Sequence, residues 1–346
     1  MDVLKNALVS STSKEPVQKT HKDASEDSRT FGLNQIYPEP RNTTETAEKN
    51  VDIIVLHGLA ARSPETFIAY KVDGDSDSGH INWLANNDML SADMPYARIL
   101  TYDWNANYDK SASSDIFSGH AKTLLDRIHV NRRRTGRLQR PIIFVASCFG
   151  GLLLAKVRLF PSSSSYKYFE ILRYTVGVAF LGTPFRGSWP TGHTATQLRI
   201  AVAMSASAEE RFESSQELVQ LLRSGTTEDP SPLDELVNTF VEQIQFGPYK
   251  FPIVCFYETR HTNFSAVLRT LPADFAQTQV DENGHGIVVP RHSACLPGAD
   301  SAAMDCRHNM LQKFNSPDND GFQRLTDRLM EYAENAQETL MKKDRM

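Results

Sequence analysis

The sequence has few cysteines and no long hydrophobic run, and each absence excludes a class of protein. Its 346 residues include only 4 cysteines, without the C-x-x-C spacing of a zinc site or the density of a disulfide framework. No apolar run reaches the ~20 residues that span a bilayer, and the N-terminal residues lack the apolar stretch of a secretory signal. We therefore expect a cytoplasmic protein without a transmembrane segment, a setting in which a free thiol survives.

The sequence also lacks a strong excess of charge of one sign. A formal net charge of -5 gives no footprint for nucleic acid or for an anionic membrane. The one basic cluster, Arg132–Arg134 with Arg137 and Arg140, lies where a helix should end, and cations are favourable there. We expect this cluster to be a solvated helix end, and we expect the partner to be a small molecule rather than nucleic acid.

Apolar runs divide the chain into a tail and one large domain. Residues 1–48 are polar and lack periodicity, so we expect a flexible tail in which Phe31–Leu33 is the candidate for a short ordered piece. Residues 49–340 alternate helical patterns with predicted strands at Val51–Leu56, Ala97–Tyr102, Pro141–Ala146, Thr175–Leu181, Phe251–Phe256 and Gly286–Val289. This alternation predicts a mostly parallel central sheet with helices on both faces, joined by right-handed crossovers.

The segment Val145–Gly151 is the most informative part of the sequence. It follows an apolar run, Pro141–Phe144, and precedes a second apolar run, Leu152–Val157, that has the character of a helix. Strand, sharp turn and helix form the context of a nucleophile elbow, in which G-x-S-x-G places the nucleophile on a strained turn above a parallel sheet. The segment therefore predicts an α/β-hydrolase fold.

The spacing of small residues indicates which side chain stands at the apex of the turn. An elbow needs small residues two positions before and two positions after the nucleophile, because larger side chains would collide. Ala146 and Gly150 meet this demand around Cys148, whereas around Ser147 the same positions hold a valine and a phenylalanine. We therefore predict Cys148 as the nucleophile, where serine is usual. Its position at a helix N-terminus favours the thiolate over the thiol.

Such a nucleophile needs a base and an acid that orients the base, in the chain order nucleophile, acid, histidine. Glu258 stands at the carboxyl end of the next-to-last predicted strand, the edge at which such sheets meet ligands. Asp281, in a later polar loop, is the alternative acid. Behind the last predicted strand come His292, which is too close for a loop to swing back, and His308, which has room. We predict His308 as the base and Glu258 as the acid.

The third requirement is an oxyanion hole, a pair of N–H groups that receive the negative charge on the substrate oxygen. One donor is expected from the N–H of Phe149, directly after the nucleophile. The second is expected from the loop His57–Ala60 after the first predicted strand. There Gly58 allows the backbone to approach closely, and Leu59 or Ala60 presents its N–H.

No strand is predicted between Gly192 and Gly247. Ser231 and Pro232 form a helix start, with a capping residue followed by proline at the first helical position. The helix then places one apolar face at Leu233, Leu236, Val237, Phe240 and Ile244. We interpret residues 192–247 as a helical cap over the active site, with an ordinary packing insertion as the alternative. A closing helix is predicted from the spacing of Phe322, Leu325, Leu329, Tyr332 and Ala336.

Several motifs resemble one family of α/β-hydrolases. Val55–Leu59, the elbow and Phe180–Ser188 together resemble the DUF676/SERAC1-like lipase-type hydrolases. In fungi such domains are often called SesB-like and are attached to NLR-type receptors. The resemblance extends from about Val51 to Leu329, which is most of the chain. No G-x-x-x-x-G-K-[ST] motif follows, so the nucleotide-binding module of those receptors is not expected here.

The resemblance also assigns roles to individual residues. The elbow of that family usually reads His-Ser-Leu-Gly-Gly, so its nucleophile corresponds to Cys148 and its histidine to His308, while its acid corresponds to Glu258. This sequence departs from the pattern at two positions, because cysteine replaces the serine and Ser147 replaces the preceding histidine. The family's lipase activity is therefore not carried over to this chain.

Together these features predict an acyl-transfer enzyme that acts on an ester, thioester or lactone without metal or cofactor. A thioester acyl-enzyme is more open to carbon and nitrogen nucleophiles than an oxygen ester, so transfer or cyclisation, as in natural-product tailoring, stands beside hydrolysis. The alternative is a catalytically inactive domain for signalling or partner binding, as in fungal receptors. A lost serine fits that alternative, but an intact His308 and Glu258 do not.

Overall fold

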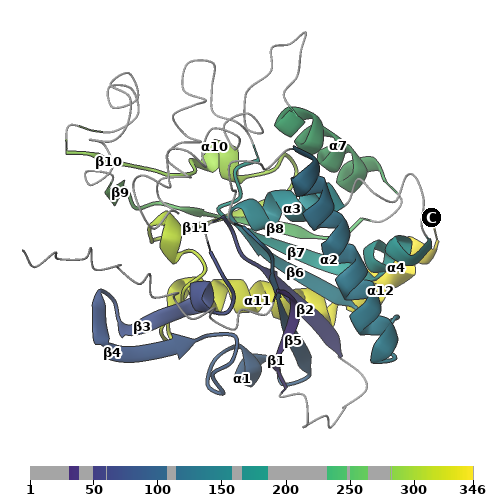
Figure 1. Ribbon diagram of the computed structural model, residues 1–346, viewed down its shortest axis with the longest axis horizontal. Coiled ribbons are helices and arrows are strands. Elements are labelled where there is room, and N and C mark those ends of the chain that lie inside the picture. The colour runs from purple at the N-terminus through teal and green to yellow at the C-terminus, as the bar shows by residue number, and fades with distance from the viewer. Residues whose placement is uncertain are drawn as a thin grey trace, which may run out of the picture. The chain divides into compact units, whose positions relative to one another are not determined.

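A seven-stranded sheet forms the centre of the domain, in the order β1-β5-β2-β6-β7-β8-β11 (Figure 1). Its strands are β1 (Gly32–Tyr37), β2 (Val51–Leu56), β5 (Ala97–Asp103), β6 (Ile142–Ser147), β7 (Thr175–Leu181), β8 (Ile253–Glu258) and β11 (Asp300–Met304). Neighbouring strands are parallel except for the antiparallel pair β1 and β5. Every residue of β2, β5, β6 and β7 is buried, as expected for strands covered on both faces.

The computed structural model describes residues 31–38, 50–59, 61–106, 114–157, 166–185, 232–247, 250–263, 281 and 283–345. All of them belong to one compact unit, Phe31–Met346. Within these residues no helix combines the length and the apolar character that crossing a membrane requires.

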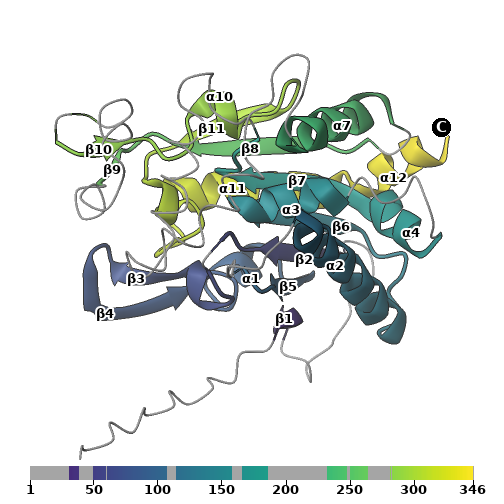
Figure 2. The same cartoon turned by 45° about the horizontal axis from the view of Figure 1, so that its top comes forward.

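Helices cover both faces of the sheet (Figures 1 and 2). The first face packs against α2 (Ser114–Arg134), α3 (Phe149–Val157), α4 (Tyr166–Tyr174) and α7 (Pro232–Phe246). The second face packs against α1 (Leu90–Asp93), α11 (Asp320–Glu334) and α12 (Ala336–Asp344). Side chains of β2 alternate between the two layers, with Ile54 in the first and Ile53 and Val55 in the second. The strand order and the two helical layers confirm the predicted α/β-hydrolase fold.

The sheet begins inside the range that the sequence predicts as a flexible tail. Residues Gly32–Tyr37 form β1, the antiparallel edge strand, with Gly32 opposite Asp103. The prediction of a tail over residues 1–48 is therefore wrong for this strand. An edge strand with an irregularity near its end carries little of the apolar alternation that marks a buried strand. The rest of that range, residues 1–30 and 39–48, lies outside the described residues.

The last strand of the sheet also differs from the prediction. The predicted strand Gly286–Val289 does not join the central sheet, and its first residue belongs to a separate pair formed by β9 (Thr262–Asn263) and β10 (His285–Gly286). The edge strand on this side is β11, which pairs in parallel with β8. Its sequence, Asp-Ser-Ala-Ala-Met, consists mostly of small and polar residues and therefore gives no strand signal.

The basic cluster after α2 is only partly the solvated helix end that we expected. Asp52 is fully buried at the start of β2, and it accepts hydrogen bonds from Arg98 at 2.9 and 2.8 Å and from Arg132 at 2.8 Å. Arg140 completes the group at 3.2 Å, whereas Arg133–Arg134 are exposed. The expectation is thus wrong for Arg132 and Arg140, because a carboxylate on a neighbouring strand draws both into the interior. Such a pairing cannot be read from local charge alone.

The helical segments follow the predicted patterns where the structure describes them. In α7 the predicted apolar residues Leu233, Leu236, Val237 and Phe240 are buried, and Ile244 packs against the same core. The remaining residues of the predicted cap, 192–231, lie outside the described residues. The closing helix is present as α11, which continues into α12. Short elements not predicted are η1 (Glu65–Phe67), the hairpin β3 (Ile68–Val72) and β4 (Asp75–Asn82), α10 (Arg291–Ala294) and η3 (His308–Met310).

Candidate active site

The turn between β6 and α3 has Cys148 at its apex. Cys148 has φ 49°, and it is the one non-glycine residue with positive φ in the part of the chain that the structure describes. A left-handed conformation is costly for a residue with a side chain, so a surrounding structure has to impose it. The N–H of Cys148 donates to the carbonyl of Leu181 at 2.8 Å, which fixes the turn above β7.

Two glycines after the apex allow α3 to start this close to the sheet. A side chain at Gly150 would place its Cβ 2.6 Å from the carbonyl oxygen of His57. A Cβ at Gly151 would lie 2.0 Å from the hydroxyl oxygen of Thr183. Both distances are well below van der Waals contact, so even alanine at either position would require His57 or Thr183 to move.

Ser147, the other candidate residue in this segment, occupies a different environment. It is the last residue of β6, is 2% exposed, and donates a hydrogen bond from its hydroxyl to the carbonyl of Leu56 at 3.3 Å. Its side chain therefore joins β6 to β2 rather than standing at the apex of the turn.

His308 and Glu258 lie together beside Cys148. His308 begins η3, shortly after β11, and its Nδ1 donates to Oε2 of Glu258 at 2.9 Å. The His308 side chain also forms a hydrogen bond with the Cys148 thiol. Because Nδ1 is engaged by the carboxylate, Nε2 is the nitrogen that faces the sulfur. The structure thus brings together the three residues predicted as nucleophile, base and acid.

The Glu258 carboxylate is held on both oxygens. Besides the bond to His308, its Oε1 accepts the backbone N–H groups of Val288 at 2.9 Å and Val289 at 2.8 Å. Glu258 is 3% exposed, so water does not compete for these bonds. The apolar run that we interpreted as the last strand therefore has another role here, since it fixes the carboxylate that orients His308.

The surroundings of His308 hold a proton on its ring. Burial alone would lower the pKa of His308, but the negative charge of Glu258 and the hydrogen bonds to Cys148 and Glu258 raise it to about 10. The raised pKa favours the imidazolium form of His308, which is the form that stabilises a neighbouring thiolate.

The other candidates for acid and base lie elsewhere. Asp281 is exposed, and its carboxylate accepts the N–H groups of Asn283 at 2.9 Å and His285 at 2.8 Å, so it stabilises a turn. These backbone hydrogen bonds lower the pKa of Asp281. His292 is exposed on α10. Among the described contacts, none joins Asp281 or His292 to Cys148 or His308.

Of the predicted oxyanion donors, Phe149 and Leu59 lie within the described part of the chain. Phe149 is the first residue of α3 and is buried, and the N–H groups of a first helical turn have no partner within the helix. Leu59 is 3% exposed in the loop after β2. Ala60 lies outside the described residues, so the choice between Leu59 and Ala60 for the second donor stays open.

A buried network that the sequence did not reveal supports this loop. His57 is fully buried, with its Nε2 2.9 Å from Oδ1 of Asp103 and its Nδ1 2.8 Å from the carbonyl oxygen of Gly58. The indole N–H of Trp104 donates to the carbonyl of His57 at 3.0 Å. Because Asp103 belongs to β5, only the pairing of β2 with β5 brings these residues together.

Gly182 is a second residue that sequence reasoning missed. It has φ 61°, and a Cβ there would lie 2.9 Å from Cε1 of His308 and 2.6 Å from a methyl group of Leu311. The residue after β7 must therefore be glycine for two reasons, the backbone conformation and the ring above it. The Gly-Thr-Pro sequence that opens this turn was visible, but its contact with His308 depends on the tertiary fold.

Comparison with known proteins gives likeness in structure only. No protein-family model and no curated protein matches the sequence. Among solved structures, the lipase BlEst2 of Bacillus licheniformis is similar with a TM-score of 0.49 and 15% identity, over 86% of this chain and 96% of that one. The esterase RhEst1 of Rhodococcus sp. ECU1013 has a TM-score of 0.41 and 12% identity, over 84% and 93%.

A third similar structure is the NocB thioesterase domain, in covalent complex with a fluorophosphonate nocardicin G analog. Its TM-score is 0.40 and its identity 11%, over 87% of this chain and 99% of that one. Likeness at this level concerns the fold, and function has to come from the geometry of the site itself.

Proposed function

We propose that the protein is an acyl-transfer enzyme that acts on an ester, thioester or lactone through Cys148, His308 and Glu258. The observation that supports this proposal best is the continuous chain of hydrogen bonds from Glu258 through His308 to Cys148, with Cys148 held at positive φ. Nucleophile, base and orienting acid in mutual contact are the geometric requirements of covalent acyl transfer.

The first half of the reaction forms an acyl-enzyme. The Cys148 thiolate attacks the carbonyl carbon of the substrate, and the electron pair of the C=O bond moves to oxygen. The N–H of Phe149 and that of Leu59 or Ala60 stabilise this oxyanion. As the tetrahedral intermediate collapses, His308 gives its proton to the leaving alcohol or thiol, and a thioester on Cys148 remains.

The second half transfers the acyl group. A water, alcohol or amine gives a proton to the now neutral His308 and attacks the thioester carbon, and collapse returns the Cys148 thiolate. Glu258 holds the ring in one orientation throughout and stabilises the imidazolium. The charges that develop are carried by thiolate, imidazolium and backbone N–H groups, so the proposed chemistry needs neither metal nor cofactor.

A thioester intermediate makes the choice of acceptor part of the proposal. Thioesters react readily with nitrogen nucleophiles, so transfer or cyclisation is included beside hydrolysis. We interpret residues 192–247 as the cap that would select the substrate, and α7, at its end, packs against α3 directly behind the elbow. We also propose that the protein is related to the DUF676/SERAC1-like hydrolases. Its proposed location is the cytoplasm, where the thiol stays reduced.

Trapping the acyl-enzyme tests the proposal. The native protein is mixed with p-nitrophenyl butyrate and with an acyl thioester, and the intact mass is measured after rapid acid quench. We expect an added butyryl group that maps to Cys148 and that is absent in Cys148→Ala. The inactive-domain alternative predicts no adduct on the native protein, and an adduct or turnover retained in Cys148→Ala would contradict the assignment of the nucleophile.

A further inference from the structure

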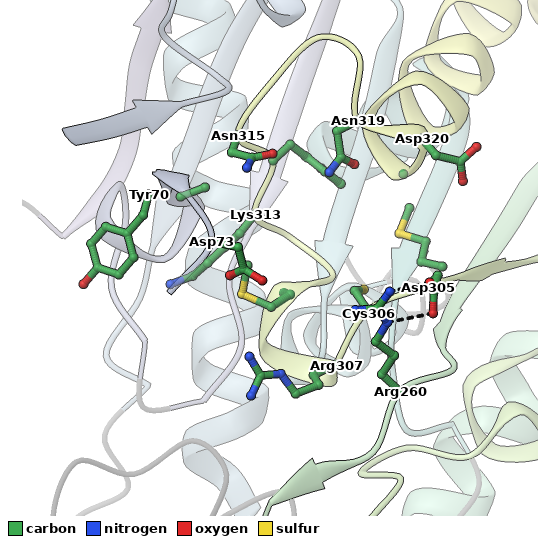
Figure 3. A pocket seen from close by; sticks show the side chains of 15 residues that line it. Tyr70, Asp73, Arg260, Asp305, Cys306, Arg307, Lys313, Asn315, Asn319 and Asp320 are labelled. Atoms are coloured by element: carbon green, nitrogen blue, oxygen red, sulfur yellow. Dashed lines mark hydrogen bonds and ion pairs between the residues drawn. The ribbon is translucent and has the colours of Figure 1, made fainter. Parts of the chain in front are cut away.

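A cavity of about 410 Å³ lies beside the segment that carries His308, outside the site described above (Figure 3). Its lining comes from the β3–β4 hairpin, a residue shortly after β8, the segment between β11 and α11, and the first turn of α11. Cys148, Glu258 and His308 do not line it. The volume falls within the ~300–1,000 Å³ typical of small-molecule sites. The proposed acyl transfer makes no use of this cavity.

The segment after β11 has two faces, and each serves a different site. The N–H of Met310 donates to the carbonyl of Arg307 at 2.9 Å, and the N–H of Lys313 donates to that of Met310 at 3.1 Å. This helical spacing places Arg307, Met310 and Lys313 on the cavity side. His308 and Leu311 are buried on the other side, against the turn after β7. A ligand in the cavity would therefore contact the same short segment that positions His308.

Two of the cations that line the cavity, Lys313 and Arg307, form no ion pair with any of the residues that the structure describes. Lys313 is half-buried, and burial lowers its pKa, yet no ion pair engages its ammonium or the Arg307 guanidinium among the described residues. Arg260, by contrast, makes two hydrogen bonds to Asp305 at 2.8 and 2.6 Å. Figure 3 shows Lys313 and Arg307 extending toward the same side of the cavity. The acidic side chain on that side, Asp73, is exposed on the hairpin turn.

A half-buried ammonium without a partner carries a desolvation cost that an anionic ligand would offset. The rest of the lining suits an organic ligand rather than an inorganic ion. Met304, Met310 and Phe314 provide an apolar wall, and the side-chain amide of Asn315 donates to the carbonyl of Lys71 at 3.2 Å and closes the side next to the hairpin.

We propose that this cavity binds a small organic anion, with its carboxylate or phosphate group between Lys313 and Arg307 and a short apolar part against Met304, Met310 and Phe314. The site is separate from Cys148. Because Arg307 and Lys313 belong to the segment that holds His308, occupancy of the cavity alters the reactivity of Cys148. The second statement rests on the proposed role of His308, and the first does not.

Calorimetric titration of the native protein with hexyl phosphate, hexanoate and inorganic phosphate tests the binding. We expect saturable binding of one or both hexyl compounds and weaker binding of inorganic phosphate, which lacks the apolar part. Tighter binding of hexyl phosphate would identify the headgroup as phosphate, and tighter binding of hexanoate as carboxylate. Absence of saturable heat with both hexyl compounds at millimolar concentration would overturn the proposal.

Matched variants locate the binding. Lys313→Met and Arg307→Gln should each weaken the affinity about tenfold or more, since each removes a charge-assisted contact. Lys342→Met, a lysine on α12 that pairs with Glu338, changes the same charge elsewhere and should leave the affinity unchanged. If Lys313→Met and Arg307→Gln both bind the ligand with the affinity of the native protein, the proposed site is wrong. Arg307 is exposed, so Arg307→Gln keeps the test decisive if Lys313→Met folds poorly.

The effect on the active site is measured separately, as the rate at which iodoacetamide alkylates Cys148. We expect the rate to change at least about twofold with added ligand, with half-saturation at the calorimetric Kd, and we expect no change in Lys313→Met. Binding without any change in the alkylation rate would refute the coupling and leave the binding site standing. A Cys148 that resists alkylation in all conditions would count against the proposed function and against the coupling, while calorimetry still decides the site.

Discussion

The fold contains two buried imidazole–carboxylate pairs, and they differ in what meets the other ring nitrogen. His57 and Asp103 lie 2.9 Å apart, as do His308 and Glu258, and all four side chains are buried. The second nitrogen of His57 lies 2.8 Å from the carbonyl oxygen of Gly58, so both ring nitrogens have partners within the fold. The second nitrogen of His308 faces a thiol.

The group that meets the other ring nitrogen, and not the histidine–carboxylate pair itself, distinguishes these two pairs. His57 stacks on Trp104 and stabilises the loop that carries a predicted oxyanion donor. The His308 ring packs against Gly182, and its second nitrogen faces Cys148, which is held at positive φ. The two pairs therefore differ in the group beyond the histidine, which is a backbone carbonyl for His57 and the Cys148 thiol for His308. Replacing the members of each pair and Cys148 one at a time tests this difference.

The largest effect is expected for Cys148→Ala, which removes the group that distinguishes the two pairs. Loss of a nucleophile removes the covalent route, so turnover should fall by about 10⁴-fold or more, while the melting temperature changes little. Cys148→Ser provides a matched comparison. Residual hydrolysis in Cys148→Ser would indicate a pocket that still suits an oxygen nucleophile, and complete loss would indicate one rebuilt around a thiolate. Turnover of Cys148→Ala at the native rate would contradict the comparison.

Replacing each histidine should separate the roles of the two pairs. His308→Ala should slow alkylation of Cys148 at pH 7 by about tenfold or more, because the thiolate loses its imidazolium partner. His57→Ala should instead reduce the free energy of unfolding by on the order of 3 kcal/mol, since the buried Asp103 carboxylate loses the imidazole and keeps the N–H of Ser63. Alkylation rates and urea unfolding are measured on both variants, with the exposed His292→Ala as control. Slower alkylation in His292→Ala than in His308→Ala would reverse our assignment of the base.

A smaller loss is expected when the acid of the second pair becomes an amide. Glu258→Gln should lower turnover by about 10²-fold, less than the ~10⁴-fold known for the acid of a serine protease, because a thiolate depends less on the orienting acid. Asp281→Asn alters an exposed carboxylate that accepts backbone N–H groups of its own turn, so its turnover should match the native protein. A larger loss for Asp281→Asn would move the acid there and leave Glu258 as a strand-end residue.

The last prediction concerns the dependence of stability on pH. The pKa of His308 is raised from its ordinary value of 6.5 to about 10 in the fold, so the folded state binds this proton more tightly than the unfolded chain does. The resulting stability is fully present below pH 6.5 and is lost as pH rises through about 10. Urea midpoints of the native protein and of His308→Gln, measured from pH 6 to 10, should therefore converge with rising pH. Midpoints that stay equally far apart would show that the proton does not contribute.

The sequence is sufficient for the part of the site that is built locally. The elbow combines a buried strand, small residues at fixed spacing and a following helix, so the amino-acid pattern alone places Cys148 at its apex. The α/β-hydrolase fold follows from the same alternation of strands and helices. Glu258 could be selected because it ends an apolar strand, and the structure places it against His308.

The contacts that cross between distant strands could not be read in this way. The strand β11, which leads to His308, has no apolar pattern because it is a short edge strand. The run Gly286–Val289 has the pattern of a strand but supplies two N–H groups to Glu258. The burial of Arg132 depends on Asp52 of another strand. In each case the contact joins residues that are far apart in the sequence, and the local pattern of apolar residues does not predict such contacts.

The order of the groups along the chain has a consequence for synthesis on the ribosome. Cys148 emerges before Glu258 and well before His308, and at typical rates the interval is on the order of 10 s. During that interval the nascent chain contains the thiol but neither the base nor the strand that brings the base to it. The strained turn itself also needs Leu181, which emerges later than Cys148. The imidazole that faces the Cys148 sulfur therefore reaches it only after β11 has joined the sheet.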